Sequence, residues 1–434
     1  MALCVGYDFT LFTTSSGTIL GYGNNIFGPA AHIVEHEHAH VLDAYTVALD
    51  GDDGGTLDSQ PVMMTASTMS WACVTRDGAV WTLGPAFGIH QTPMRLDKQT
   101  FGLSRALMMA CGETFAMLLT ESGQVWTCGR NTRGELGHGS YDDCLAMTQI
   151  NPQSFHGEHI TFIATGVEHS MALSAGGSHL WTWGDNRWHL GVLSRDIHSP
   201  VGGPPGIFAV PGLVAANTFN GVPVRSMAGS WRSTIVVTED GSMWGSGCNF
   251  LGQLGFEDPD NRLLFERVAG AEIFGEGGVR MVSCQLHSTT ILSQLGQIWT
   301  CGEHYERIPT LLPHTTDFDN AGVVCIGSGN EYSAIVREDG SHYMLAAWAD
   351  ALMIVPMPMP DVMDEIIGRW HHMPQDEQHR AMAFAQGNHP RLGYESDYRM
   401  APVEALEMVW QFLRFRPSPH AGTGLRNLMG FGPR

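Results

Sequence analysis

The feature that most constrains the fold is a short glycine and aromatic frame that recurs along the chain. In its clear copies, a glycine stands three residues before a tryptophan and another stands three residues after it. Degenerate copies extend the series to seven units, spaced by 44 to 63 residues. The central residues are Leu20, Trp81, Trp126, Trp181, Trp244, Trp299 and Tyr343. A frame that returns at this spacing predicts tandem copies of one structural unit.

Each unit contains two apolar segments joined by a turn. The segment 110–119 precedes Trp126 and is linked to it through Ser122-Gly123, and Asp240-Gly241 has the same place before Trp244. An apolar segment, a Ser-Gly or Asp-Gly turn and a second apolar segment predict a β-hairpin. A unit of about 50 residues with four short strands cannot bury both faces of its sheet, so it stacks on its neighbours. The prediction is an all-β, seven-bladed β-propeller, whose turns account for 52 glycines in 434 residues.

The repeats predict two parts, a propeller over residues 1–360 and a helical C-terminal tail over residues 361–434. In the tail, 362–370 and 403–416 carry apolar residues at helical spacing. The chain begins almost inside its first hairpin, so the first blade is expected to lack its leading strand. Because an open ring leaves sheet edges unpaired, we expect residues 351–358 to supply that strand and close the ring.

Two segments carry a more specific signature. Residues 129–137 and 247–255 are similar to the W-x-x-G-x-N-x-x-G-x-L-G motif of the RCC1 (regulator of chromosome condensation) repeat family, and residues 184–191 keep part of it. The resemblance covers roughly residues 1–360 and implies a seven-bladed propeller, in which the signature residues are structural. These residues are Trp81, Trp126, Gly129, Asn131, Gly134, Leu136, Gly137, Trp181, Asn186, Trp244, Asn249, Gly252, Leu254, Gly255 and Trp299.

The resemblance also implies a set of functions. The founding member of the family is a nucleotide-exchange factor for a small nuclear GTPase, and this exchange factor also docks on chromatin. Other members are scaffolds, ubiquitin-ligase domains or a light receptor. The light-receptor branch repeats a Gly-Trp-Arg-His-Thr element, which residues 229–234 match once and imperfectly. With 23 basic and 44 acidic residues, the formal charge is -21. This charge argues against binding of nucleic acid through the bulk field of the protein.

From these features we predict a non-enzymatic protein-interaction scaffold that binds a protein partner through its inter-blade loops, chiefly Ala30 to Ser59 and Ser199 to Asn220. The alternative is a guanine-nucleotide exchange factor for a small GTPase. A remote alternative is a zinc hydrolase, because His36-Glu37-x-x-His40 satisfies H-E-x-x-H. If that stretch is extended, His36, His38 and His40 share one face and form a candidate metal site, although an exposed polar face is the simpler interpretation.

The remaining expectations concern partners and location. No cofactor is expected, since no glycine-rich phosphate loop precedes a helix pattern. We also expect a monomer without a membrane span. Nine cysteines, an odd number without a C-x-x-C pair, do not suggest a disulfide framework. The N-terminus lacks a basic segment followed by a long apolar core. An intracellular protein, cytoplasmic or nuclear and not secreted, is therefore predicted.

Overall fold

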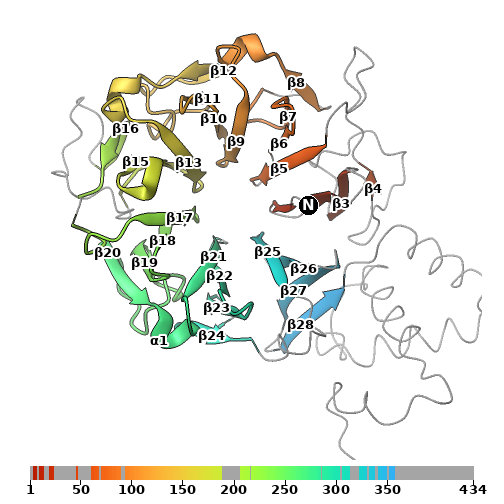
Figure 1. Ribbon diagram of the computed structural model, residues 1–434, viewed down its shortest axis with the longest axis vertical. Coiled ribbons are helices and arrows are strands. Elements are labelled where there is room, and N and C mark those ends of the chain that lie inside the picture. The colour runs from red at the N-terminus through yellow and green to blue at the C-terminus, as the bar shows by residue number, and fades with distance from the viewer. Residues whose placement is uncertain are drawn as a thin grey trace, which may run out of the picture. The chain divides into compact units, whose positions relative to one another are not determined.

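The computed structural model describes residues 3–6, 9–13, 19–23, 45–46, 60–67, 70–88, 93–187, 206–215, 217–284, 286–303, 305–312, 322–329, 332–337, 341–348 and 351–356. Over these residues the chain forms seven four-stranded sheets. Each sheet consists of four strands that follow one another in the chain, and neighbouring strands pair antiparallel, as between residues 106 and 149. The sheets surround a central axis (Figure 1). The prediction of an all-β propeller is confirmed.

We number the sheets blade 1 to blade 7 along the chain. Blades 1 to 3 consist of β1 (Leu3–Val5), β2 (Phe9–Thr13), β3 (Ile19–Gly23) and β4 (Tyr45–Thr46); β5 (Pro61–Ala66), β6 (Trp71–Thr75), β7 (Val80–Leu83) and β8 (Met94–Leu96); and β9 (Ala106–Cys111), β10 (Phe115–Thr120), β11 (Val125–Gly129) and β12 (Cys144–Gln149). Blades 4 and 5 consist of β13 (Ile160–Thr165), β14 (His169–Ser174), β15 (Leu180–Asp185) and β16 (Ile207–Leu213); and β17 (Val224–Gly229), β18 (Ser233–Thr238), β19 (Met243–Gly247) and β20 (Arg262–Ala269). Blades 6 and 7 consist of β21 (Val279–Cys284), β22 (Ser288–Ser293), β23 (Ile298–Gly302) and β24 (Thr310–Leu311); and β25 (Val323–Ser328), β26 (Tyr332–Arg337), β27 (His342–Trp348) and β28 (Ala351–Pro356).

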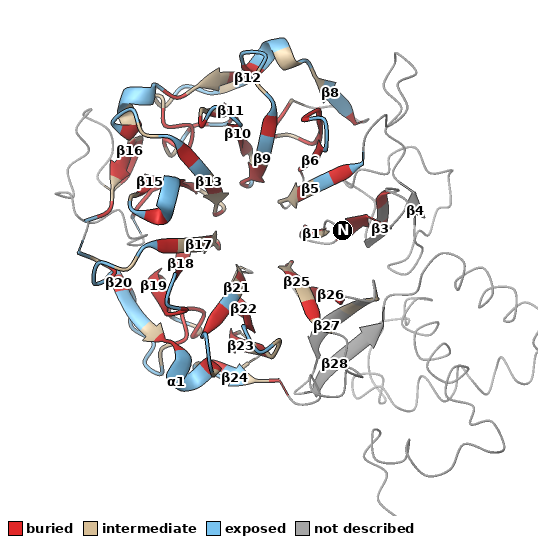
Figure 2. Cartoon of the chain, viewed as in Figure 1, coloured by how far each residue is buried: buried red, intermediate tan, exposed pale blue. Residues whose placement is uncertain are grey.

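Short helical turns lie in several connections between blades. They are the 3-10 helices η1 (Lys98–Phe101) and η2 (Pro152–Phe155) and the α-helix α1 (Ala271–Phe274). A third 3-10 helix, η3 (Ala175–Gly177), lies within blade 4. The seven first strands line the axis, and each contacts the first strand of the next blade. Buried residues are concentrated within the blades, whereas outer strands such as β8 and β20 expose many of their residues (Figure 2).

The ring closes in a different way from the one predicted. Residues 351–356 do form a strand, but β28 pairs with β27 of its own blade. Blade 1 has its own leading strand, β1, which pairs with β2 and contacts β25 of blade 7. The prediction that residues 351–358 complete blade 1 is therefore wrong. A hairpin between neighbouring strands closes only a short loop, which costs less chain entropy than pairing with a strand at the other end of the chain.

The cores lie between blades. Each of six clusters of buried side chains takes its members from two consecutive blades. The repeated tryptophans Trp81, Trp181 and Trp244 each belong to the cluster shared with the preceding blade. Burial of a tryptophan at these interfaces explains why the frame keeps this residue, since such side chains dominate the energetics of packing.

A phenylalanine from the preceding connection meets the tryptophan edge-on at three interfaces. The ring centroids of Phe155 and Trp181 are 5.6 Å apart with an interplanar angle of 89°, and those of Phe274 and Trp299 are 5.5 Å apart at 88°. Phe219 and Trp244 repeat the geometry at 5.6 Å and 84°. Each phenylalanine stands 25 or 26 residues before its tryptophan. This constant spacing is a sequence signal that the glycine and aromatic frame did not include.

Two further predictions concern segments outside the hairpins. Part of the expected loop from Ser199 to Asn220 is a strand, because β16 forms the outer edge of blade 4. Its Pro211 is compatible with that position, since an edge strand does not need every N–H for pairing. The loop from Ala30 to Ser59 lies outside the described residues except for Tyr45–Thr46, which form β4. The tail over residues 361–434 lies wholly outside them, so its helices stay a prediction.

Candidate functional site

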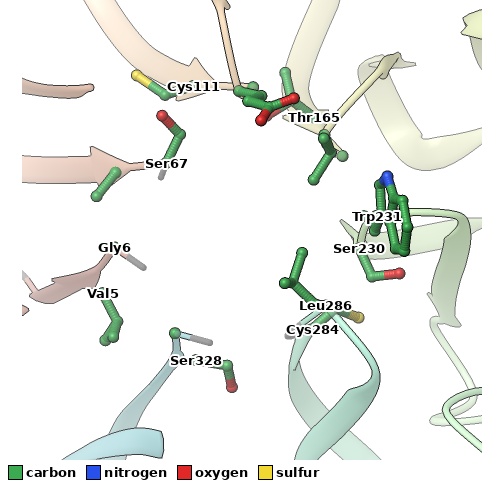
Figure 3. A pocket seen from close by; sticks show the side chains of 17 residues that line it. Val5, Gly6, Ser67, Cys111, Thr165, Ser230, Trp231, Cys284, Leu286 and Ser328 are labelled. Atoms are coloured by element: carbon green, nitrogen blue, oxygen red, sulfur yellow. The ribbon is translucent and has the colours of Figure 1, made fainter. Parts of the chain in front are cut away.

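One end of the propeller carries two kinds of loop in each blade. The AB loops join the first strand of a blade to its second, and the CD loops join the third to the fourth. We call this end the loop face. At its centre the axis opens as a hollow of about 130 Å³. Equivalent residues of the AB loops line it, among them Gly6, Ser67 and Ser230 (Figure 3). Gly112 and Gly166 have the same place in blades 3 and 4.

Hydrogen bonds between neighbouring AB loops hold part of this rim. The N–H of Glu113 donates to the carbonyl of Val167 at 3.2 Å, and the N–H of Val167 donates to the carbonyl of Ser230 at 3.1 Å. Blades 3, 4 and 5 are thus linked in sequence around the axis. The small residues are needed here because a Cβ on Gly166 would stand 2.4 Å from the Ser230 carbonyl oxygen. Backbone groups of these loops thus form part of the lining, together with side chains such as Thr165, Trp231 and Leu286.

A larger pocket of about 470 Å³ lies beside the hollow, between blades 5 and 6. Its walls come from the AB loop of blade 5, the CD loop over residues 248–261 and the AB loop of blade 6. Trp231 lines both this pocket and the axial hollow. The Arg232 guanidinium stacks 3.9 Å from the centre of the Trp231 ring, and His287 meets that ring at 5.5 Å. At the rim, Phe250 is 67% exposed.

The signature loops are CD loops, and their asparagines organise them from within. The side-chain oxygen of Asn249 accepts a hydrogen bond from Leu254 N–H at 3.0 Å, and its amide donates to Asp258 O at 2.5 Å. Asn131 forms the same pair of bonds with Leu136 N–H and Ser140 O, at 2.9 and 2.8 Å. Both asparagines are fully buried. They serve as internal supports for the loop, and their side chains do not face the pockets.

The signature glycines bring these loops against the following blade. Gly134 and Gly252 adopt positive φ angles of 74° and 86°. A Cβ on Gly134 would stand 2.7 Å from Ala209 Cα, and one on Gly252 would stand 2.6 Å from Arg307 Cα. Leu136 and Leu254 are fully buried. Asn186, in the third copy, is also buried, whereas residues 188–191 of that copy lie outside the described residues.

The hydrogen bonds of Asn249 give a first testable prediction. We expect Asn249→Ala to lower the free energy of unfolding by about 2 kcal/mol, because one N–H and one carbonyl of the loop lose their buried partner. Urea unfolding monitored by tryptophan fluorescence measures this loss. Asn217→Ala is a suitable control, because Asn217 lies in an exposed turn. A loss no larger than that of the control would show that the asparagine does not support the loop.

A group of charged side chains lies where the CD loop of blade 3 meets blade 4. Arg133 Nε is 3.6 Å from Glu168 Oε1 and 3.7 Å from Asp185 Oδ2. Within the same loop, Glu135 is buried, and its carboxylate accepts a hydrogen bond from the Arg133 N–H at 2.8 Å. Burial raises the pKa of Glu135 to about 7. Burial and the nearby Asp185 carboxylate also raise the pKa of Glu168.

The cysteine thiols near the axis are poor nucleophiles. All nine cysteines are free, and Cys111 and Cys284 line the axial hollow. Burial raises the pKa of Cys284 to about 12 and that of Cys111 well above its ordinary value. Because the thiolate is the reactive form, these side chains act as small packing groups. Burial likewise lowers the pKa of His169 to about 4, so its ring is neutral at pH 7.

The candidate metal residues His36, His38 and His40 lie outside the described residues, so the zinc-hydrolase alternative is not tested by the structure. Among the residues that are described, no group of three or more His, Cys, Asp or Glu side chains has a geometry that could hold a metal ion. Within the same residues, no helix is long and apolar enough to cross a membrane.

Several residues of the loop face carry no repeat signal that predicts a pocket. Residues 229–234 resemble the light-receptor element imperfectly, and Trp231 and Arg232 of this segment line the larger pocket. Phe250 and Leu251 stand at variable positions inside a signature loop. The position of the AB loops, always directly after an inner strand, was the signal that could have located the axial hollow.

Comparison with known proteins agrees with this architecture. The family model described as "Regulator of chromosome condensation (RCC1) repeat" matches residues 122–173. The ultraviolet-B receptor UVR8 of Arabidopsis thaliana is 27% identical over 329 residues, which are 69% of this chain and 70% of the receptor. The E3 ubiquitin-protein ligase HERC2 of Homo sapiens is 26% identical over 365 residues, which are 79% of this chain but only 7% of the ligase.

A solved structure gives the same fold. Human WBSCR16 superposes with a TM-score of 0.65 at 18% identity, covering 78% of this chain and 87% of that chain. Blades, axial hollow and signature loops define the protein as a β-propeller repeat protein. More specifically, residues 122–173 match the RCC1 repeat, and the chain is similar to proteins that contain this repeat. The matched repeat begins at the turn of blade 3 and ends in β14 of blade 4, so one sequence repeat spans two structural blades.

Proposed function

We propose that this protein is a non-enzymatic protein-interaction scaffold of the RCC1-repeat type, and that its partner binds the loop face. The observation that carries the proposal is the surface around Trp231. Two hollows meet at this side chain, and Phe250 beside them exposes two thirds of its surface. Exposed aromatic side chains next to a concavity are typical of protein interfaces, where tryptophan and arginine carry much of the binding energy.

The relatives support a binding role without identifying the partner. UVR8 is named as a receptor and HERC2 as a ubiquitin ligase, and the matched region of HERC2 is a small part of a much longer protein. A propeller that occurs in proteins of such different function is consistent with a general binding module. The nine free thiols further support our proposal of an intracellular location, because reducing compartments keep cysteines unpaired.

Photo-crosslinking tests where the partner binds. A photoreactive benzoylphenylalanine replaces Phe250 on the loop face or, as a control, Leu145 on the outer strand β12, which is 66% exposed. Both variants are irradiated in cells that express the protein, and captured proteins are identified by mass spectrometry. The proposal predicts a stoichiometric partner captured from position 250 and absent from position 145. Capture only from position 145, or none from either, would contradict it.

The exchange-factor alternative has a direct kinetic test. A guanine-nucleotide exchange factor accelerates release of a fluorescent GDP analogue from a small GTPase, whereas a scaffold leaves the release rate unchanged. We expect no acceleration across a panel of purified small GTPases. Acceleration by the full chain would replace the scaffold proposal with the exchange-factor one. Elemental analysis of the purified protein tests the remote zinc-hydrolase alternative, because that chemistry requires one zinc ion per chain at His36-Glu37-x-x-His40.

A further inference from the structure

The pocket between blades 5 and 6 combines apolar walls with one buried side-chain amide. We propose that this pocket binds an uncharged, apolar segment of the partner protein, with a bulky side chain between the walls and a backbone carbonyl on the amide of Gln253. The inference rests on the proposed scaffold function and adds the chemistry of the partner segment. Its basis is the hydrogen bonding of Gln253, the surface of the walls and the balance of the charges around them.

Gln253 brings a polar group to the pocket from the signature loop of blade 5. The residue lines the pocket although it is only 2% exposed. Its side-chain oxygen accepts a hydrogen bond from Leu251 N–H at 3.0 Å, but among the described residues its amide nitrogen donates to no acceptor. The amide of Asn249, in the same loop, does donate to Asp258 O. Because a buried donor without a partner is costly, a ligand that supplies an acceptor to Gln253 gains affinity.

The walls of the pocket are mainly apolar and partly exposed. Trp231, Leu251 and Leu286 are half-buried, and Pro259 is exposed. Phe250, which also lines the pocket, is 67% exposed. The volume of about 470 Å³ is in the range of pockets that enclose small ligands, so it has room for a leucine or phenylalanine side chain. Exposed apolar surface with a polar rim is typical of interaction sites.

The walls are held in place by contacts within the protein. The Arg232 guanidinium stacks on the Trp231 ring at 3.9 Å, and His287 meets the same ring at 5.5 Å. Arg307, from the CD loop of blade 6, donates to the Phe250 carbonyl at 3.0 Å. Both arginines therefore support the walls. Fixed walls lose little conformational freedom when a ligand binds, which lowers the cost of binding.

The charges around the pocket favour an uncharged occupant. The lining contains one arginine and one aspartate, Arg232 and Asp260, so its formal charges cancel. Beside it, Arg262 pairs with Asp258 at 2.7 Å and with Glu266 at 2.9 Å. A charged ligand group would lose water next to charges of both signs and gain little net attraction, which makes its burial costly. A backbone carbonyl carries no charge and needs only a donor.

The overall charge disfavours two other classes of occupant. RNA or DNA would present many phosphates to a molecule with a formal charge of -21, which repels a polyanion over its whole length. A second copy of this chain carries the same charge and meets a similar repulsion. An uncharged segment of a partner protein meets neither penalty and is the occupant that fits the walls and the amide.

A display library of random 12-residue peptides, selected on the full chain, tests the class of ligand. Selected peptides are synthesised with a fluorescein label, and their affinity is measured by fluorescence anisotropy. We expect a shared motif in which a bulky apolar residue has no Asp, Glu, Lys or Arg directly beside it. Phe250→Ser should weaken binding about 10-fold, equivalent to about 1.4 kcal/mol. The matched control Leu145→Ser, on the outer strand β12, should have no effect.

The nearly isosteric variant Gln253→Glu tests the hydrogen bond. The new carboxyl can still accept from Leu251 N–H, but when ionised it presents an acceptor to the ligand carbonyl. Burial raises the pKa of Glu135, the equivalent residue of blade 3, to about 7, so the new carboxyl should be ionised at pH 8 and protonated at pH 5.5. Relative to the original chain at the same pH, we expect binding to be about 10-fold weaker at pH 8 and nearly equal at pH 5.5. Gln99→Glu adds the same charge on the exposed η1 and should match the original chain at both pH values.

Three results would each overturn the inference. They are a selected motif with a charged residue beside the apolar one, failure to select any peptide, and equal affinity of Gln253→Glu and the original chain at pH 8. If Gln253→Glu melts below the assay temperature at pH 8, Phe250→Ser and the selected motif decide the question. A molar mass that doubles with concentration and returns to the monomer value in Phe250→Ser would assign the pocket to a second copy instead.

The outcome can be distinguished from failure of the proposed function. A partner that is captured through position 250 and binds Gln253→Glu as tightly as the original chain at pH 8 would overturn this inference and leave the scaffold proposal standing. A chain that accelerates GDP release and captures no partner would overturn the scaffold proposal itself. Loss of the captured partner in Gln253→Glu at pH 8, together with retention in Gln99→Glu, would support both.

Discussion

Gly134→Ala should lower the free energy of unfolding by about 4 kcal/mol or prevent folding. Gly134 has a φ of 74°, and its Cβ would stand 2.7 Å from Ala209 Cα and 2.9 Å from Ala209 N, both in the backbone of blade 4. A positive φ costs an alanine about 1 to 2 kcal/mol, and overpacking against an immobile backbone costs about 1 to 3 kcal/mol more. Urea unfolding at equilibrium measures the loss.

Gly157→Ala separates the two contributions. Gly157 has nearly the same φ, 76°, but its Cβ would meet no atom within 4 Å. This substitution should lower the free energy of unfolding by only about 1 kcal/mol, which is the conformational cost of the positive φ. Both substitutions stiffen the unfolded chain equally, so the difference between them reports the contact between blades 3 and 4. Equal losses would show that the signature glycine is required for its backbone angle and not for close packing.

The sequence predicts the strands well because each blade repeats the same local chemistry. Glycine three residues before and after Trp126 marks the ends of a buried strand, and Asp240-Gly241 marks a tight turn, so neither depends on distant contacts. The error at the end of the chain has a different origin. Residues 351–356 could complete blade 1 only if its inner position were empty, but Leu3–Val5 occupies that position. Neither segment alone shows which of the two takes it.

The same reasoning explains what the sequence shows of the candidate site. The asparagine and glycines of the signature loops are predictable because the same loop structure, with the same asparagine hydrogen bond, recurs in blades 3 and 5. The pocket between blades 5 and 6 is not predictable from the sequence, because it depends on the contact of these two blades and on variable loop positions. Trp231 and Phe250 are separated by a hairpin, and only the CD loop brings them to one pocket. β16 was missed because Gly206, Pro211 and Gly212 are typical of loops, although an edge strand accommodates them.

Glu135→Gln should make the protein more stable at pH 8 by about 3 kcal/mol and leave its stability at pH 4.5 nearly unchanged. Burial raises the pKa of Glu135 from 4.5 to about 7. Between these values the folded chain keeps the proton while the unfolded chain releases it, so stability falls as pH rises through this window. Below pH 4.5 both states are protonated and the penalty disappears. Above pH 7 the full cost of burying the carboxylate is present, about 3 kcal/mol from the shift.

Blade 5 shows that glutamine fits this position. Gln253 is the equivalent residue, is equally buried, and accepts a hydrogen bond from Leu251 N–H at 3.0 Å, as Glu135 does from Arg133 N–H at 2.8 Å. The reciprocal variant Gln253→Glu should therefore become less stable as the pH rises. This is the pH dependence that Glu135→Gln removes. Urea unfolding at both pH values, on both variants, measures the effect. A stability difference between Glu135→Gln and the original chain that stays constant from pH 4.5 to pH 8 would mean that Glu135 titrates normally, with its charge held by Arg133 in spite of burial.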